Sequence, residues 1–173
     1  MYPTHSTSAQ KVHLITTGGT IDSYYDIDAC TVFPLSESPI PAYLKKYIRL
    51  DDNKLQHTPI CCKDSREIDE HDLSSIYQSI LTNDSRAHVI THGTFTVFDS
   101  ARKLKAMLGD NNRHTVVFTG AMWPLEGFSL NDAAFNLGAS IMAAKCSAPG
   151  VYVVFFGEVY DVEAMESLHV SMR

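Results

Sequence analysis

The chain has 173 residues, of which 45% are hydrophobic, so it can build the core of one domain and does not have a disordered composition. Its net charge of −6 offers no general attraction for nucleic acid or anionic lipid, and we expect neither as a partner. No apolar run approaches the roughly 20 residues that span a membrane, and the first ten residues lack the features of a signal peptide. We therefore expect a cytoplasmic protein with a flexible N-terminus at residues 1–10.

The first part of the chain predicts a strand, a long loop and a helix. Residues 11–16 form a short apolar run that Gly18 and Gly19 stop, as expected of a buried strand entering a tight loop. Residues 20–39 are polar and show no period, which indicates a long loop, and such loops are often functional. Residues 41–50 predict a helix with a proline in its first turn.

The middle of the chain predicts two strands, each followed by a helix. Residues 54–62 have an extended pattern. Two acidic residues then open an apolar-periodic stretch that predicts a helix over 69–81. Residues 87–91 predict a buried strand, and 97–108 predict a helix that Gly109 ends.

The last part of the chain completes an alternation of strands and helices. Residues 114–119 and 150–156 predict buried strands, the Ala-rich residues 131–145 predict a helix between them, and 162–173 predict a short terminal helix. This alternation predicts an α/β fold, a three-layer open sandwich with a mainly parallel sheet of about four to six strands and helices on both faces. We expect 11–173 to form a single domain.

No pattern in the sequence predicts a metal or a cofactor. Cys61 and Cys62 are adjacent and no CxxC is present, so we expect reduced thiols and not a zinc site or a disulfide framework. The eight histidines show no ligand spacing. The segment TGGTID after the first strand lacks the G-x-G-x-x-G spacing of a dinucleotide site, and the chain has no P-loop.

Three predicted strands end in polar, Gly-containing turns, at residues 17–20, 91–94 and 119–121. The carboxyl ends of parallel strands meet at one edge of the sheet, where ligands bind in this architecture. Glycines there let the backbone approach a ligand, and exposed amide N–H groups can stabilise an oxyanion. A threonine hydroxyl is a nucleophile only beside a base or a polarising partner. The alternative is that each threonine caps a turn or helix, and His92 is interpreted as a residue packed beneath its turn and not as a base.

Two of these turns carry motifs similar to those of the L-asparaginase/glutaminase family. They are TGGTI at 17–21 and ITHGT at 90–94. KDSR at 63–66 resembles the family's substrate-carboxylate loop, and the segments 119–122 and 131–137 resemble the part of the family that follows the next strand. The order and spacing match over nearly the whole chain and cover the family's N-terminal domain, so the chain looks like a short, single-domain member.

The resemblance implies a role for each matching residue. Thr20 matches the nucleophile, and Tyr25 matches the tyrosine of the flexible loop that activates it, with Tyr24 as an alternative. Thr94 matches the second catalytic threonine, which helps to activate water or the substrate amide. The substrate-binding positions implied by the match are Gly19, Asp64, Ser65, Gly93 and Phe95, with Asp64 and Ser65 holding the carboxyl end of the substrate. The resemblance also implies a homodimer or a higher homo-oligomer with contacts near the crevice.

Two positions depart from the family pattern T-H-G-T-D-T and its lysine partner. Phe95 stands where the family has the aspartate that holds the substrate's α-ammonium group, and Ser167 stands near the place of the lysine. Loss of one charged partner alone would leave the other unpaired at a cost, so loss of both indicates a coordinated change to an uncharged subsite. The alternative is that Phe95 points into the core and the register of the turn has shifted.

These observations lead to three hypotheses about function. The first is an amidohydrolase that converts a small carboxylate-bearing amide, asparagine or an analogue without the α-ammonium group, to an acid and ammonia. The second is a catalytically impaired relative that binds a small carboxylate or amide. The third is a purely structural or interaction role.

Overall fold

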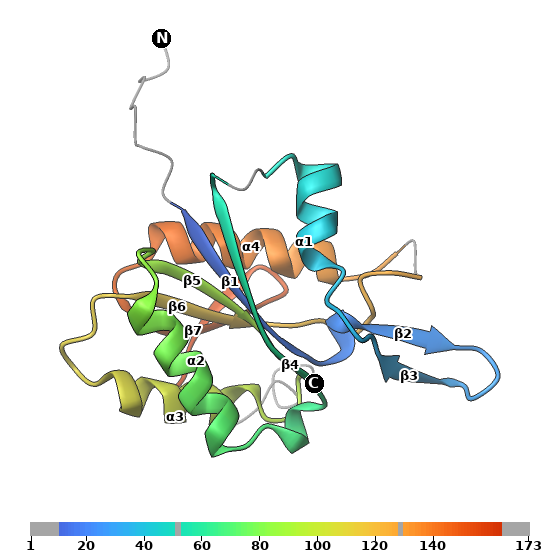
Figure 1. Ribbon diagram of the computed structural model, residues 1–173, viewed down its shortest axis with the longest axis horizontal. Coiled ribbons are helices and arrows are strands. Elements are labelled where there is room, and N and C mark those ends of the chain that lie inside the picture. The colour runs from blue at the N-terminus through green and yellow to red at the C-terminus, as the bar shows by residue number, and fades with distance from the viewer. Residues whose placement is uncertain (1–10, 51–52, 128–129, 164–173) are drawn as a thin grey trace, which may run out of the picture.

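A six-stranded sheet forms the centre of the molecule, in a computed structural model that describes residues 11–50, 53–127 and 130–163 (Figure 1). The strands are β1 (Val12–Gly18), β4 (Leu55–Lys63), β5 (Ala87–Thr91), β6 (Thr115–Thr119), β7 (Gly150–Phe155) and β8 (Glu158–Asp161). Their order is β4-β1-β5-β6-β7-β8, and β8 alone runs antiparallel to its neighbour. The prediction of a mainly parallel sheet is confirmed.

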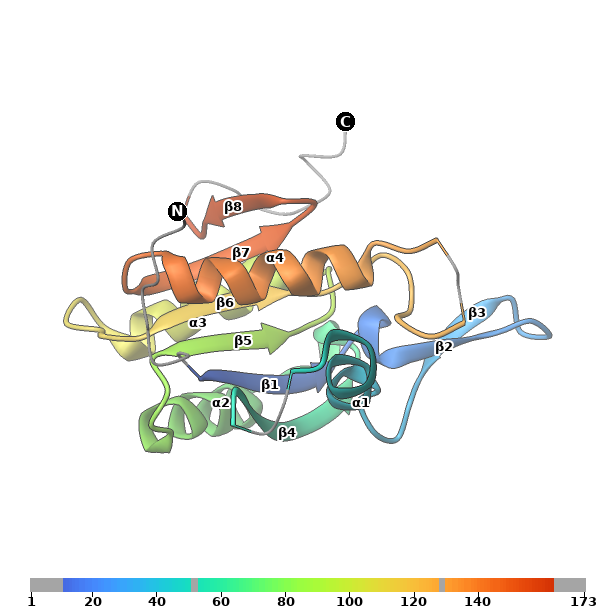
Figure 2. The same ribbon diagram turned by 90° about the horizontal axis from the view of Figure 1, so that it is seen from above.

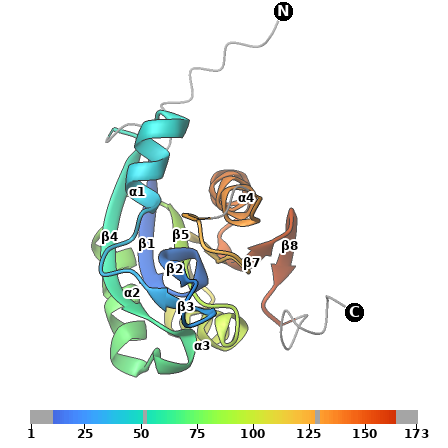
Figure 3. The ribbon, with the colours of Figure 1, turned by 90° about the vertical axis from the view of Figure 1, so that its right-hand side faces the viewer.

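Helices cover both faces of this sheet (Figures 2 and 3). On one face lie α2 (Glu70–Thr82) and α3 (Val97–Leu108). On the other lie α4 (Ala133–Cys146) and α1 (Ile40–Tyr43), which continues as a π-helix over Leu44–Ile48. No helix in the described residues is long and apolar enough to cross a membrane.

The two hydrophobic cores follow from the alternation of side chains along each buried strand. Leu14 of β1 belongs to the core that contains Leu137 of α4. The next residue, Ile15, belongs to the core that contains Ile76 of α2 and Phe98 of α3. Successive side chains of a strand point to opposite faces of the sheet, so a strand that is buried at every position, as β1 is, needs helices on both sides. The predicted three-layer sandwich is therefore confirmed.

The ends of the two helices on the α2 side lie where the sequence predicts them. Asp69 accepts a hydrogen bond from the backbone N–H of Asp72 at 2.9 Å, and the Asp72 carboxylate accepts one from the N–H of Asp69 at 3.1 Å. This reciprocal capping box fixes the start of α2. Gly109 ends α3 with a φ of 70°.

The segment 20–39 is not a plain loop, because it contains the hairpin of β2 (Ser23–Asp26) and β3 (Thr31–Pro34). Figure 1 shows this hairpin projecting from the carboxyl end of the sheet. Each strand has only four residues, most of them half-buried or exposed, so neither produces a buried apolar run in the sequence.

The end of the chain also differs from its prediction. The strand β8 follows β7 directly through a turn at Phe156 and Gly157, which both have positive φ. Its residues are largely exposed, which hides it from a search for buried strands. Most of the terminal helix expected at 162–173, like the N-terminal residues 1–10, lies outside the described residues.

Candidate active site

The first two predicted turns meet at the carboxyl edge of the sheet, backbone against backbone. Gly19 has a φ of 81°, and a Cβ at this position would lie 2.5 Å from the backbone nitrogen of Gly93. The third turn lies equally close to the second, because a Cβ at Gly120 would lie 2.2 Å from the carbonyl oxygen of His92. Only residues without a side chain permit these approaches.

A small cavity of about 100 Å³ lies between the first two turns. It is lined by Gly19, Thr20, Ser23, Val32, Pro34, Lys63, Asp64, Ser65, Gly93, Thr94 and Phe95. The fold thus brings together every site residue predicted from the sequence except Tyr25. Thr20 comes from the turn after β1, and Thr94 from the turn after β5. Both threonines therefore face one crevice, as expected.

Asp22, for which the sequence predicted no role, connects the Thr20 turn to its surroundings. Its buried carboxylate accepts hydrogen bonds from the hydroxyls of Ser38 at 2.5 Å and Thr91 at 3.2 Å. Burial raises the pKa of Asp22 to about 6, although these hydrogen bonds and one from the Gly18 backbone act in the opposite direction. The side chain holds the turn against the end of β5. An acid directly after Ile21, just beyond the polar turn, was the only signal in the sequence.

The hairpin distinguishes the two candidate tyrosines. Tyr25 pairs with Val32, and Ser23 pairs with Pro34. Because directly paired and alternate residues of a hairpin share a face, Tyr25 lies on the same side as the cavity-lining Ser23, Val32 and Pro34. Tyr24 lies on the opposite side, where its ring packs against the ring of its partner on β3 with the centroids 6.1 Å apart. Tyr25 does not line the cavity itself and is 37% exposed.

The turn after β4 supplies Ser65 to the cavity. The Ser65 hydroxyl is buried and has no hydrogen-bond partner among the described residues. It lies against Gly93, where a Cβ would be only 2.9 Å from the Ser65 oxygen. The Thr96 hydroxyl donates to the Ser65 carbonyl at 2.7 Å and fixes the position of this turn. Ser65 is therefore a buried hydroxyl at the cavity wall whose hydrogen-bonding capacity is unused among the described residues.

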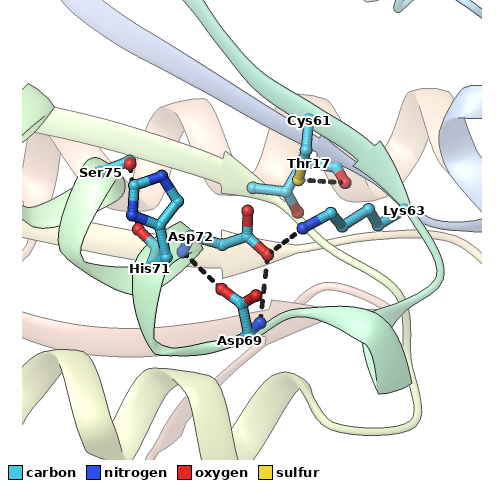
Figure 4. A network of polar contacts seen from close by, with 7 residues as sticks. All are labelled: Thr17, Cys61, Lys63, Asp69, His71, Asp72 and Ser75. Carbon is cyan, nitrogen blue, oxygen red and sulfur yellow. Dashed lines mark hydrogen bonds and ion pairs between the residues drawn. The ribbon is translucent and has the colours of Figure 1, made fainter.

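An ion pair beneath this turn anchors it to α2 (Figure 4). Lys63 Nζ lies 2.6 Å from Asp72 Oδ2, and the same carboxylate takes part in the capping box. The Asp72 carboxylate raises the pKa of Lys63. On the neighbouring part of β4, Cys61 donates to the Thr17 carbonyl at 3.3 Å. The segment that carries the predicted carboxylate-binding residues is thus tied to regular elements.

Phe95 lies at the cavity and not in the core. Its side chain is 56% exposed, and the guanidinium carbon of Arg66 lies 4.7 Å from the centre of its ring. The alternative in which Phe95 points into the core is wrong, because its side chain is exposed and lines the cavity. Ser167, near which the family lysine was expected, lies outside the described residues.

His92 is buried beneath its turn, as the sequence predicts. Its Nδ1 lies 2.8 Å from the carbonyl oxygen of Gly93, and its ring meets the edge of Phe118. Burial lowers the pKa of His92, so the ring is neutral and Nδ1–H donates to that carbonyl. Its Nε2 is buried without a hydrogen-bond partner in the described part of the chain, so the residue is satisfied on one side only.

The candidate site brings together hydroxyl groups from three neighbouring turns, those of Thr20, Ser65 and Thr94. Within the described ranges, no three His, Cys, Asp or Glu side chains are grouped to hold a metal ion. All four cysteines are free thiols. The site offers two hydroxyl groups from Thr20 and Thr94 and the Ser65 donor, which together suit attack on a carbonyl.

Comparisons with known proteins identify the family of the chain. A family model described as asparaginase, N-terminal, matches residues 11–173. The chain belongs to the asparaginase family. The thermostable L-asparaginase of Thermococcus kodakarensis superposes with a TM-score of 0.73 at 28% identity, over 88% of this chain and 46% of that one. The probable cytoplasmic L-asparaginase of Campylobacter jejuni has the same fold, with a TM-score of 0.74 at 24% identity over 89% of this chain and 48% of that one.

Curated relatives of the chain include components of an amidotransferase. A glutamyl-tRNA(Gln) amidotransferase subunit from Aeropyrum pernix is 28% identical over 95% of this chain and 39% of its own length. Its counterpart from Methanococcus vannielii is 36% identical over 47% of this chain and 18% of its own length. The chain therefore spans less than half the length of the relatives that it matches. The family resemblance seen in the sequence is confirmed.

Proposed function

We propose that this chain is an amidohydrolase that cleaves a small, carboxylate-bearing amide into an acid and ammonia. The observation that carries the proposal is the shared cavity of Thr20 and Thr94, closed by the contact between Gly19 and Gly93. Membership of the asparaginase family supports it. We propose that 11–173 acts as a single domain and that the whole protein works in the cytoplasm without a cofactor.

The proposed reaction has two steps. In the first, Thr20 Oγ bonds to the amide carbon, its proton passes by way of the Tyr25 hydroxyl to the nitrogen, and the C–N bond breaks to release ammonia. In the second, water that Thr94 orients attacks the ester, which frees the acid and restores the Thr20 hydroxyl. Backbone N–H groups of the turn at Gly93 stabilise the oxyanion in both steps. Tyr25 reaches this position by movement of the hairpin, since it lies on the cavity side but outside the lining.

We assign the carboxyl end of the substrate to the turn at Asp64 and Ser65, with the Ser65 hydroxyl as its donor. The Ser65 hydroxyl supports this assignment because it is buried at the cavity wall without a hydrogen-bond partner among the described residues. A ligand carboxylate would satisfy it. Phe95, in contrast, provides no charge for an α-ammonium group and offers at most a cation–π contact. We therefore expect amides without this group, such as succinamate, to match or exceed L-asparagine in kcat/KM.

The test is release of ammonia from L-asparagine, L-glutamine and succinamate by the wild type and by Thr20→Ala. The substitution removes a hydroxyl from a loop without opening a sizeable core cavity, so the fold should remain. Loss of the nucleophile should lower kcat by orders of magnitude. Thr82→Ala, at the exposed end of α2, is the matched control and should keep wild-type activity. Thr20→Ala with activity within tenfold of wild type would exclude Thr20 as the nucleophile.

Phe95 favours a second candidate, a protein that binds a small carboxylate or amide without cleaving it. The side chain lies at the cavity where the family pattern has an aspartate, so the site differs from that pattern at a binding position. In this case the acids and amides would bind to the wild type, but none of the amides would release ammonia above the rate of Thr20→Ala.

A further inference from the structure

The charged residues around the cavity are already paired with one another. Lys63 and Asp64 are the charged residues among those that line it in the described part of the chain. Lys63 binds Asp72, and Asp64 binds Arg66 through both carboxylate oxygens. The described wall therefore presents no carboxylate that lacks a cationic partner. A ligand ammonium that enters the cavity would have to compete with Arg66 for Asp64.

Arg66 itself is held in place from two sides. Its Nε and terminal nitrogen donate to Asp64 at 2.8 and 3.0 Å, a bidentate arrangement with fixed geometry. Its guanidinium carbon lies 4.7 Å from the centre of the Phe95 ring, which forms part of the cavity wall. A guanidinium has five N–H donors, and Asp64 takes only two of them. The group therefore keeps both its charge and free donor capacity beside Asp64 and Phe95, two residues that line the cavity.

We propose that Arg66 is a specificity-determining residue that makes this cavity select ligands with an uncharged or anionic group where an amino acid carries its ammonium. Two effects act together. Arg66 neutralises Asp64, the one carboxylate on the described wall, and it adds a cation beside Phe95. A dicarboxylate or its monoamide gains N–H donors from Arg66, whereas an α-ammonium meets a like charge. As a statement about amide substrates, the inference rests on the proposed function; as a statement about binding, it does not.

Screening by solvent limits how strongly Arg66 can affect the choice of ligand. The Arg66 and Asp64 side chains are 64% and 40% exposed, so water and salt screen their fields. Interactions between exposed charges are weak. We therefore expect Arg66 to change the preference between the two kinds of ligand only about fivefold at low ionic strength. The preference should shrink as salt is added. A preference that came only from the shape of Phe95 would not depend on salt in this way.

The experiment measures the dissociation constants of succinate and L-aspartate, two acids that differ by one ammonium group. The wild type should bind succinate more tightly. Arg66→Gln frees the Asp64 carboxylate and should lower the ratio of the L-aspartate constant to the succinate constant about fivefold, while Arg66→Lys keeps the charge and should lower it less. Lys103→Gln removes the same charge from the exposed face of α3 and should leave the ratio unchanged.

Several outcomes would overturn the inference. One is a ratio of the L-aspartate to the succinate dissociation constant that stays within twofold of wild type in Arg66→Gln. Another is a change of this ratio in Lys103→Gln that equals the change in Arg66→Gln. The third is failure of both acids to bind at millimolar concentration. Hydrolysis of succinamate and L-asparagine is measured on the same proteins. If the binding ratio changes but no amide releases ammonia, the assignment of Arg66 stands and the proposed function fails. If ammonia is released and the ratio does not change, the proposed function stands and the assignment of Arg66 is wrong.

Discussion

At the scale of single residues, the site depends on backbone contacts that only glycine allows. Gly19 combines two constraints, a φ of 81° and a position where a Cβ would overlap the backbone of Gly93. Each constraint alone would select glycine. Together they hold the turn of the proposed nucleophile against the turn of Thr94, so the spacing of the two threonines is set by main chain and not by flexible side chains.

Substitution of Gly19 by alanine should therefore damage both stability and function. A positive φ costs a non-glycine residue about 1–2 kcal/mol, and the overlap with Gly93 adds to it, so we expect a loss of about 2–4 kcal/mol in the free energy of unfolding. Gly109 is the matched control. Its φ is 70°, but a Cβ there meets nothing within 4 Å. Gly109→Ala should therefore lose only the roughly 1–2 kcal/mol that a positive φ costs. Denaturant unfolding of both variants measures the difference; equal losses would show that the contact with Gly93 is not tight.

At the scale of elements, a row of histidines joins neighbouring strands at the opposite end of the sheet from the cavity. His13 of β1 contacts His88 of β5 through their Nδ1 atoms at 3.0 Å, and His88 Nε2 lies 3.0 Å from His114, just before β6. On the other side, His13 Nε2 lies 2.8 Å from the Thr58 hydroxyl of β4. Each contact between rings needs one N–H and one bare nitrogen, which neutral imidazoles provide and fully protonated ones do not.

This row should make the protein less stable below neutral pH. Burial lowers the pKa of His13 to about 4 and of His88 to about 3, with nearby histidines acting in the same direction. In the unfolded chain both would take up protons near pH 6.5. Their contribution to the free energy of unfolding is therefore fully present above that pH and is lost as the pH falls toward 4. Asp22 acts in the opposite direction, since its raised pKa of about 6 favours the folded state on acidification.

His13 and His88 outweigh the single carboxyl group, because each group contributes at most about 1.4 kcal/mol per pH unit. The lowered pKa values of His57 and His92 act in the same direction as theirs. The net expectation is a loss of about 1 kcal/mol per unit between pH 6 and pH 4. Denaturant unfolding at a series of pH values measures it. His88→Gln should be less stable at pH 7.5 but should show a shallower decline on acidification. An unchanged slope would mean that His88 does not titrate differently in the two states.

The hairpin is the second element whose arrangement makes a prediction. Tyr25 lies on its cavity side and Tyr24 on the other, a difference that depends on the pairing register alone. Tyr25→Phe should therefore lower kcat at least about 100-fold, as expected for loss of a proton-transfer group. Tyr24→Phe removes the same atom one residue away and should stay within about threefold of wild type. A larger loss of kcat in Tyr24→Phe than in Tyr25→Phe would mean that the hairpin adopts another register during catalysis.

At the scale of the whole molecule, the sequence predicted most of the architecture because the fold depends on local patterns. The strand at 87–91 and the helix at 97–108 lie where apolar runs, helical periodicity and Gly109 place them. The hairpin and β8 were missed because short, exposed strands carry no burial pattern. The roles of Asp22 and Arg66 were missed for another reason. They lie in contacts with Thr91 and Phe95, residues far away in the sequence that only the folded chain brings close.

The hairpin also bears on how copies of the molecule associate. A two-stranded ribbon is marginally stable alone in water, yet this one projects from the sheet with Tyr24 and Phe33 at 43% and 41% exposure on the side away from the cavity. Ile27 at its tip is 81% exposed. Burial of these side chains by a second copy would stabilise the hairpin beside the proposed site, and closed two-fold dimers are the commonest assembly of soluble proteins.

We therefore expect a homodimer, or a larger assembly, at micromolar concentration. Phe33→Asp would place a charge in the proposed contact and should shift the protein toward the monomer. Leu81→Asp, on the exposed side of α2 where 49% of the side chain is accessible, introduces the same charge elsewhere and should leave the assembly intact. Light scattering coupled to size-exclusion chromatography measures the mass of each protein. A wild type that is a stable monomer would contradict the expectation. Equal dissociation of both variants would show that the hairpin is not the contact, because a general effect of the added charge would then account for the change.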